Sequence, residues 1–163
     1  MAVELVAVDE ADKSVLERVL QFYLYDFAEI RGEALTPHGT YTYRYLDGYF
    51  TDEDREAWFI KAGGELAGFA FVRGDLPEDW NVGEFFVLRK FRRQGVASEA
   101  ARLLFTGHPG EWTLSFDHDN APAAAFWPGI VRAVATGAVE VDDAHKHESG
   151  APSTRLRFQV ADL

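Results

Sequence analysis

With 163 residues, 47% of them hydrophobic, the chain can bury a core within one domain, and its lack of cysteine excludes disulfides, cysteine metal ligands and a cysteine nucleophile. Its 16 Lys and Arg residues against 27 Asp and Glu residues give a net charge of −11, which argues against nonspecific binding to nucleic acid or to an anionic membrane. No apolar run approaches the length of a membrane span and no basic, apolar leader is visible, so we expect a single domain over residues 1–163 in the cytoplasm.

The N-terminal part of the sequence predicts a strand followed by a long helix. Val3 to Val8 is a short apolar stretch of strand-forming residues. Asp9 or Asp12 is suited to cap a helix that runs to about Glu29. Its apolar positions cover a wide face, which predicts deep burial: Val15, Leu16, Val19, Leu20, Phe22, Tyr23 and Phe27.

Tyrosines are concentrated in one region of the sequence. All six lie between residues 23 and 49, and residues 31 to 40 read as a loop. Two interpretations stay open: an aromatic secondary core under a loop, or the wall of a substrate pocket in which rings supply area and hydroxyls orient the ligand. On the second interpretation, the candidate substrate-binding residues are Tyr25, Asp26, Tyr41 and Tyr43.

Three strands are predicted in the middle of the chain. Glu56 to Lys61 and Leu66 to Arg73 flank Gly63-Gly64, which is a hairpin turn signal. After a polar connection, Val82 to Leu88 forms an apolar, aromatic run that is short enough to be a buried strand.

A basic loop and a helix follow this third strand directly. The loop reverses the acidic character of the chain locally, through Arg89, Lys90, Arg92 and Arg93. Gly95 lets the backbone approach a ligand closely, and Ser98 is a candidate helix cap. The helix carries one apolar stripe, formed by Val96, Ala100, Leu103 and Leu104. Because a helix N-terminus presents unpaired N–H groups, the unit predicts a site for a phosphate or pyrophosphate.

The C-terminal third predicts a strand, a helix and a final strand pair. Trp112 to Phe116 alternates apolar and polar residues, and a turn leads into a helix over Ala121 to Val134. We expect Pro128-Gly129 to kink or end the first segment of that helix. Ala138 to Val141 and Thr154 to Val160 form the expected strand pair, separated by a long polar excursion.

The basic loop carries a family resemblance. In Arg92 to Ala97 an Arg is followed, after two residues, by Gly95, and after one more residue by a small Ala. With the strand before it, this motif resembles the acyl-CoA pyrophosphate loop of the GNAT superfamily of N-acyltransferases, and the order of predicted elements is also the order of that superfamily. The resemblance implies an α+β fold with a mixed, mostly antiparallel sheet of about six to seven strands, flanked by helices and splayed between the fourth and fifth strands.

The resemblance also implies a cofactor site. A second motif follows the fifth strand, where Asn120, Ala123 and Trp127 stand at the positions of an Asn, a small residue and a Tyr in many members. The family Tyr can protonate the leaving thiolate, but an indole N–H is far too weak an acid to do so. By resemblance, the residues that bind acetyl-CoA are Phe86, Val87, Leu88, Arg89, Arg92, Arg93, Gln94, Gly95, Val96, Ala97, Ser98, Asn120, Ala123 and Trp127.

Acyl transfer to an amine requires a base, because the amine attacks in its neutral form. Four candidates stay open, namely Glu84, Asp117, His118 and Asp26, of which we favour Glu84 and then His118 as catalytic residues. Glu84 lies on the fourth strand, where acids commonly serve as bases in the family, and burial among aromatic residues would raise its pKa. His118 or one of the tyrosines is a candidate for the general acid.

The favoured function is therefore direct N-acetyl transfer from acetyl-CoA to a small, cationic or aromatic amine, without a covalent enzyme intermediate. The alternative is a CoA-binding sensor or interaction module without transferase activity, which Trp127 keeps open. No metal is expected, since the nearby His145 and His147 lack a third ligand at a recognisable spacing. Members of the superfamily are often homodimers, although no interface is legible in the sequence.

Overall fold

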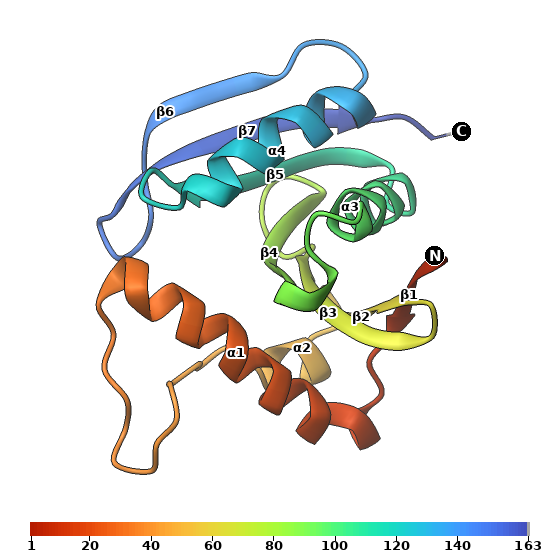
Figure 1. Ribbon diagram of the computed structural model, residues 1–163. Coiled ribbons are helices and arrows are strands. Elements are labelled where there is room, and N and C mark those ends of the chain that lie inside the picture. The colour runs from red at the N-terminus through yellow and green to blue at the C-terminus, as the bar shows by residue number, and fades with distance from the viewer. Residues whose placement is uncertain (163) are drawn as a thin grey trace.

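The computed structural model describes residues 1–162 and has a seven-stranded sheet flanked by helices (Figure 1). The elements in chain order are β1 (Val3–Ala7), α1 (Lys13–Arg31), α2 (Gly48–Thr51), β2 (Arg55–Ala62), β3 (Glu65–Arg73), β4 (Trp80–Val87), α3 (Val96–Thr106), β5 (Gly110–Asp117), α4 (Ala121–Val134), β6 (Glu140–Lys146) and β7 (Pro152–Val160). The predicted α+β class and the predicted element order are both confirmed.

The strands are arranged in the order β1-β2-β3-β4-β5-β7-β6. All neighbours are antiparallel except β4 and β5, which are parallel and pair at only two positions, Trp80 with Trp112 and Asn81 with Thr113. Beyond Asn81 the two strands diverge, which confirms the predicted splay between the fourth and fifth strands. The sheet thus consists of two halves joined by a short region of parallel pairing.

Two layers of helix bury the two faces of the sheet. α1 and α2 pack against β2, β3 and β4, in a cluster that includes Leu16, Leu20 and Phe69. α3 and α4 cover the opposite face, where Phe105 and Trp112 belong to a second cluster. Of the seven apolar positions predicted for α1, four are buried, namely Leu16, Val19, Leu20 and Tyr23. The prediction was wrong for Phe22, which is 57% exposed, and it missed the buried Leu24.

The ends of the helices differ from the expectations in three places. A 3-10 turn over Glu10–Asp12 precedes α1, and Asp12 makes no side-chain cap. The N-cap of α3 is Gly95, with φ of 78°, and no side chain, that of Ser98 included, caps this helix. Pro128 does not end α4, which continues to Val134. A proline inside a helix lacks only one N–H, and tertiary packing of Val131 in the core holds the helix beyond it.

The final strands are longer than expected. β6 begins at Glu140 and runs to Lys146, and β7 begins at Pro152, so most of the predicted polar excursion is strand. β6 is the edge of the sheet and is almost wholly exposed, which explains why its sequence, EVDDAHK, lacks an apolar alternation. Among residues 1–162, no helix is both long and apolar enough to cross a membrane.

Candidate active site

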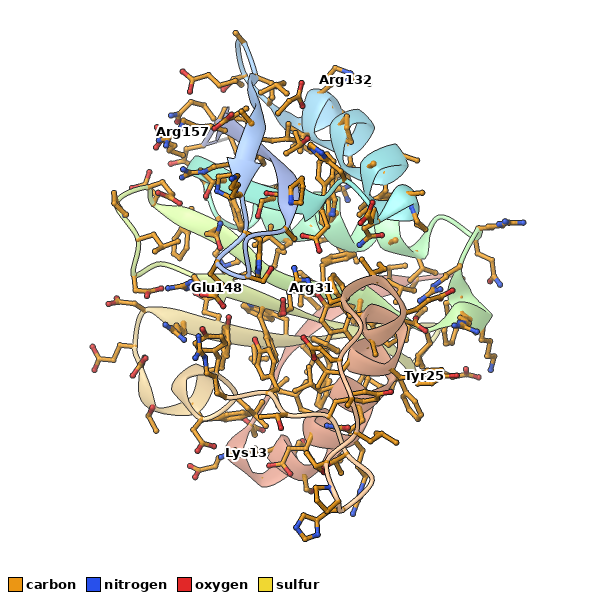
Figure 2. The ribbon with its side chains drawn as sticks, turned by 90° about the vertical axis from the view of Figure 1, so that its left-hand side faces the viewer. Lys13, Tyr25, Arg31, Arg132, Glu148 and Arg157 are labelled. Carbon is orange, nitrogen blue, oxygen red and sulfur yellow. The ribbon has the colours of Figure 1, made fainter. Side chains whose placement is uncertain are left out.

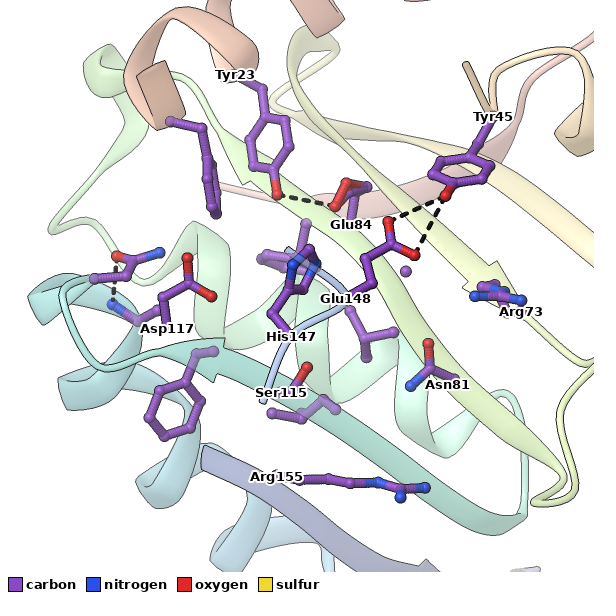
Figure 3. Close-up of a pocket in the computed structure, with 18 of the residues that line it drawn as sticks. Tyr23, Tyr45, Arg73, Asn81, Glu84, Ser115, Asp117, His147, Glu148 and Arg155 are labelled. Atoms are coloured by element: carbon purple, nitrogen blue, oxygen red, sulfur yellow. Dashed lines mark hydrogen bonds between the residues drawn. The ribbon is translucent and has the colours of Figure 1, made fainter. Parts of the chain in front are cut away.

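A cavity of about 930 Å³ lies where β4 and β5 separate. Its walls come from α1, the tyrosine-rich segment that follows it, β4, β5 and the turn between β6 and β7. Figure 2 labels Arg31 of α1 and Glu148 of the β6–β7 turn, which both line the cavity, and Figure 3 shows 18 of the lining side chains.

Glu84 is brought to the cavity by a bulge in β4. Phe71 of β3 pairs with Glu84, but the next residue, Val72, pairs with Val82, so Gly83 is the extra residue on β4. A bulge of this kind shifts the alternation of side chains by one residue and re-aims those that follow. Glycine leaves room in the bulge for Tyr49, because a Cβ at this position would lie 2.5 Å from the hydroxyl oxygen of Tyr49 and would force that side chain to shift.

The surroundings of Glu84 hold its pKa near neutrality. Burial raises the pKa of this carboxyl to about 7. The hydroxyl of Tyr23 donates a hydrogen bond to Oε1 at 3.2 Å and lowers the pKa, as does Arg31, while Glu148 and Asp117 raise it. A carboxyl with a pKa close to the working pH is suited to accept and release a proton.

The other polar groups around Glu84 are fixed by hydrogen bonds across the cavity. Arg31 donates from Nε and Nη2 to both carboxylate oxygens of the buried Asp117, at 2.9 and 3.1 Å. The hydroxyl of Tyr45 donates to Glu148 at 3.0 Å, which joins the tyrosine-rich segment to the β6–β7 turn. Burial raises the pKa values of Tyr23, Tyr43 and Tyr49, so these phenols stay protonated.

The wall on the α4 side is apolar. Trp127 is 7% exposed and packs against Phe85, with ring centroids 5.1 Å apart. Ala123 lies one turn earlier, and its N–H donates to the side chain of Asn120 at 3.3 Å, which caps α4. The second motif of the sequence therefore lies on one side of the opening between β4 and β5.

The N-terminus of α3 lies next to the C-terminal end of β4 and offers unpaired donors. Arg93 and Gly95 have positive φ angles of 63° and 78°. In the described part of the chain, no protein acceptor receives a hydrogen bond from the backbone N–H groups of residues 93–98. No heavy atom would lie within 4 Å of a Cβ at Gly95, so the space before these N–H groups is open. Consecutive free N–H groups at a helix N-terminus fit a diphosphate.

Two other basic residues of this loop, Arg89 and Arg92, form ion pairs within the protein. Arg89 and Arg92 both donate to Asp26, at 2.7 and 3.1 Å, and Arg92 Nε also donates to the carbonyl oxygen of Val87 at 2.9 Å. Asp26 thus orients two arginines that the sequence assigns to the cofactor.

The structure brings together only some of the residues predicted for the substrate and for catalysis. Glu84, Asp117 and Tyr43 line the cavity, whereas Tyr41 lines a neighbouring pocket of about 350 Å³. Tyr25 is 64% exposed on α1 and lies outside both. His118 is exposed, hydrogen-bonds Thr154 and does not line the cavity. His145 and His147 contact Ser153 and Ser149 respectively.

Several lining residues were missed by the sequence reasoning. Tyr23, one of the six clustered tyrosines, was not among the four candidate substrate-binding residues, yet its hydroxyl donates a hydrogen bond to Glu84. Arg73 is the last residue of β3, and Arg155 lies within β7. Glu148 lies in the segment that the sequence predicts to be a polar loop. The one signal available was the placement of arginines inside apolar strands, since a charged side chain in such a position needs a partner.

Comparison with known proteins adds three findings. The model of the acetyltransferase (GNAT) family matches residues 23–128. An acetyltransferase structure from Thermus thermophilus is 20% identical, covers 98% of both chains and has a TM-score of 0.73. Spermidine N-acetyltransferase from Vibrio cholerae, solved with CoA and spermine, is 9% identical, covers 97% of this chain and 95% of its own, and has a TM-score of 0.63. No curated protein matches the sequence.

Proposed function

This chain belongs to the acetyltransferase (GNAT) family, and from that membership we propose that it moves an acetyl group from acetyl-CoA directly to the amine of a small acceptor. The proposal treats residues 1–163 as one acyltransferase domain in the cytoplasm, without a metal or nucleic acid, and as a homodimer. The observation that carries it is the divergence of β4 from β5, with Glu84 in the cavity and the free N–H groups of residues 93–98 beyond the C-terminal end of β4.

The donor would be held by residues at the two sides of the opening between β4 and β5. The N–H groups of Arg93 to Ser98 would bind the diphosphate, and the β4 backbone from Phe86 to Leu88 would bind the pantetheine arm. Asn120, Ala123 and Trp127 would form the facing wall. When bound, acetyl-CoA supplies a thioester whose carbonyl carbon is the point of attack and whose thiolate leaves.

Glu84 would act as the general base. It would accept a proton from the acceptor's ammonium group, so that the nitrogen lone pair becomes available. Tyr23, which donates a hydrogen bond to Glu84, would orient the carboxylate during this transfer. Trp127 cannot supply a proton to the leaving thiolate, but a thiol pKa of about 8.5 allows the thiolate to leave without one. His118, the second candidate for catalysis, lies outside the cavity and has no role in this proposal.

The second candidate function is a CoA-binding sensor or interaction module. It is favoured by the buried Trp127 at the position where many family members have Tyr. Both functions predict that acetyl-CoA raises the melting temperature, because a ligand that binds only the folded state stabilises it.

A turnover assay separates the two functions. The purified protein is incubated with acetyl-CoA and a panel of small amines, and the release of CoA thiol is followed together with the mass of the acetylated product. The transferase predicts product with at least one amine, and loss of that product in Glu84→Gln. Stabilisation by acetyl-CoA without any acetylated product across the panel would favour the module. If acetyl-CoA does not change the melting temperature, both functions are wrong.

A further inference from the structure

A line of side chains crosses the sheet at the end of the cavity where β4 and β5 still pair. It consists of directly paired residues on five neighbouring strands: Arg55, Arg73, Asn81, Thr113 and Arg157. Directly paired residues project to the same face of a sheet, and Arg155 shares the face of Arg157 because it is two residues away. All four arginines line the cavity, and we call Arg55, Arg73, Arg155 and Arg157 the arginine cluster.

Most carboxylates that pair with the arginine cluster lie outside the cavity lining, and the exception is Glu78. Asp75 receives hydrogen bonds from Arg55 and Arg73, which lower its pKa to about 2, chiefly through the hydrogen bond from Arg73, and Arg157 pairs with Glu111. Neither Asp75 nor Glu111 lines the cavity. These carboxylates therefore fix the guanidinium groups in place.

The guanidinium groups of the arginine cluster retain N–H donors that their carboxylate partners do not use. Each carries five N–H donors, and only some of these are used by the paired carboxylates, namely Asp52, Asp75, Glu78, Glu111 and Glu140. Nε of Arg55 is buried and makes no hydrogen bond within the described residues, and Oδ2 of Asp52 lies 3.7 Å from it. Among residues 1–162, Arg155 forms one ionic contact, to Glu78 at 3.4 Å. Arg55 and Arg73 also face each other directly on β2 and β3, an arrangement of like charges that destabilises a sheet.

Basic side chains outnumber acidic ones in the lining of the cavity. Seven Lys and Arg residues line it against five Asp and Glu residues, although the chain carries a net charge of −11. Figure 3 shows Arg73, Asn81 and Arg155 on the side away from Tyr23 and Asp117, with Glu84 between them. The arginine cluster and Glu84 lie at different positions along β4, because Arg73 pairs with Asn81, which is three residues before Glu84.

We propose that the acceptor is a primary amine that also carries an anionic group, a carboxylate or a phosphate, with its nitrogen at Glu84 and its anionic group on the arginine cluster. This inference rests on the proposed acetyl transfer and names the acceptor of that reaction. Guanidinium groups held in a fixed orientation bind carboxylates and phosphates through paired hydrogen bonds. The arginine cluster repels a polyamine, whose further positive charges would lie against it.

Matched pairs of amines test the proposal. The full chain is assayed with acetyl-CoA and with glycine, β-alanine, γ-aminobutyrate and lysine, each beside its neutral amide, with O-phosphoethanolamine beside ethanolamine, and with spermidine. We expect kcat/KM for at least one anion-bearing amine to exceed that of its neutral partner by ten-fold or more. The acid–amide pairs report on a carboxylate and the ethanolamine pair on a phosphate. Equal or better turnover of the neutral partners or of spermidine would overturn the proposal.

Substitutions in the arginine cluster test whether the preference for anion-bearing amines arises there. Arg73→Gln and Arg155→Gln should each reduce it by about ten-fold, and Arg73→Lys should retain part of it, because the charge remains while the paired geometry is lost. Arg132→Gln, which removes an exposed arginine on α4 outside the cavity, should leave it unchanged (Figure 2). Melting temperatures confirm that each variant is folded. A preference that survives both Arg→Gln substitutions would contradict the assignment of the arginine cluster.

Binding separates this inference from the proposed function. The same amines are titrated in the presence of CoA, and the melting temperature is recorded. If no amine is acetylated but anion-bearing amines still stabilise the wild type and not Arg73→Gln, acetyl transfer is wrong and the anion site stands. If amines are acetylated without regard to their charge, this inference alone is wrong. If neither turnover nor stabilisation is seen, both are wrong.

Discussion

At the scale of single residues, the cavity depends on Glu84 and on the glycine before it. The bulge at Gly83 turns Glu84 toward Tyr23, and burial raises its pKa to about 7. A carboxyl with an ordinary pKa would be ionised at neutral pH but would be a poor acceptor for an ammonium proton. The bulge and the aromatic surroundings therefore have one chemical result, a carboxyl that exchanges protons near pH 7.

Glu84→Gln should lower kcat at pH 8 by roughly 10²- to 10⁴-fold, the usual contribution of a general base. In the wild type, kcat/KM should rise with pH through a value near 7, because the base must lose its proton, and this rise should disappear in the variant. A pH–rate profile with the best anion-bearing amine measures both effects.

Stability gives the control for this variant. A folded-state pKa raised from 4.5 to about 7 means that ionisation of Glu84 destabilises the fold as pH increases from 4.5 to 7. Gln carries no such charge, so the variant should melt at the same or a higher temperature than the wild type at pH 8. An unchanged kcat in a variant with unchanged stability would exclude Glu84 as the base.

At the scale of elements, the N-terminus of α3 and the His108 region after its C-terminus have different roles. The N-terminus has an open glycine and free N–H groups. The imidazole of His108 contacts Glu56 at 2.7 Å and the carbonyl oxygen of Leu104 at 2.7 Å. Rings of Trp58, Trp80 and Trp112 surround it, with centroid distances of 6.1, 4.8 and 5.8 Å. The first end is available to a ligand, and the second connects α3 to β2.

Gly95→Ala should weaken acetyl-CoA binding, because a side chain would project into the open space before the free N–H groups and the φ of 78° would be strained. The strain should lower the free energy of unfolding by about 1–2 kcal/mol. Isothermal titration with acetyl-CoA measures the affinity. Gly129→Ala, in open space within α4 and without a positive φ, is the matched control and should bind normally. Equal affinity of the two variants would contradict the diphosphate assignment.

The pair of His108 and Glu56 should make stability depend on pH. Burial opposes protonation of His108, but the hydrogen bonds to Glu56 and to Leu104 outweigh it and raise its pKa above 6.5. The hydrogen bond to His108 lowers the pKa of Glu56 below 4.5. The contribution of His108 is thus present below pH 6.5 and lost as pH rises through its folded-state pKa, while that of Glu56 is present above pH 4.5 and lost at lower pH.

It follows that Glu56→Gln should lower the melting temperature more at pH 5.5 than at pH 8.5. Differential scanning calorimetry at the two pH values measures the difference. Glu99→Gln, which removes an exposed carboxylate that pairs with Arg102 within α3, serves as the control and should show little difference between the two pH values. An equal loss in Glu56→Gln at both pH values would mean that the pair is not ionised in the folded state.

The elements could be predicted from the sequence wherever the signal is local. The hairpin at Gly63-Gly64 and the strand, basic loop and helix around Gly95 are set by residues close together in the chain, and both are confirmed. The partner of Glu84 is 61 residues away on α1, and the arginine cluster exists only through strand register. Such contacts leave no local pattern, which explains why Tyr25 was expected in the pocket and Tyr23 was not. β6 was missed in part because an exposed edge strand needs no apolar alternation.

At the scale of the whole molecule, the two halves of the sheet are connected across the cavity by side chains as well as by β4 and β5. The ion pair of Arg31 with Asp117 joins α1 to β5 over a separation of 86 residues. Tyr45 and Glu148 form a second connection over 103 residues. Because β4 and β5 pair at only two positions, these contacts contribute to holding the halves in register.

Arg31→Met should lower the free energy of unfolding by about 3–5 kcal/mol, because it leaves the carboxylate of Asp117, whose side chain is 5% exposed, without its counter-charge. The double variant Arg31→Met with Asp117→Asn should recover a large part of the loss. Urea denaturation of the wild type, both single variants and the double variant completes the cycle. Additive losses would show that the two residues do not interact in solution.

The absence of a side chain at Gly83 leaves room for Tyr49 on the wall of the cavity. A Cβ at Gly83 would collide with the phenol oxygen of Tyr49 and approach Cγ of Arg73 at 3.5 Å. A side chain at this position would therefore displace the ring of Tyr49, which lines the cavity, while Arg73 would keep an ordinary van der Waals distance. Residues of increasing size at this one backbone position should thus change the space open to an acceptor without removing a charge from the cavity.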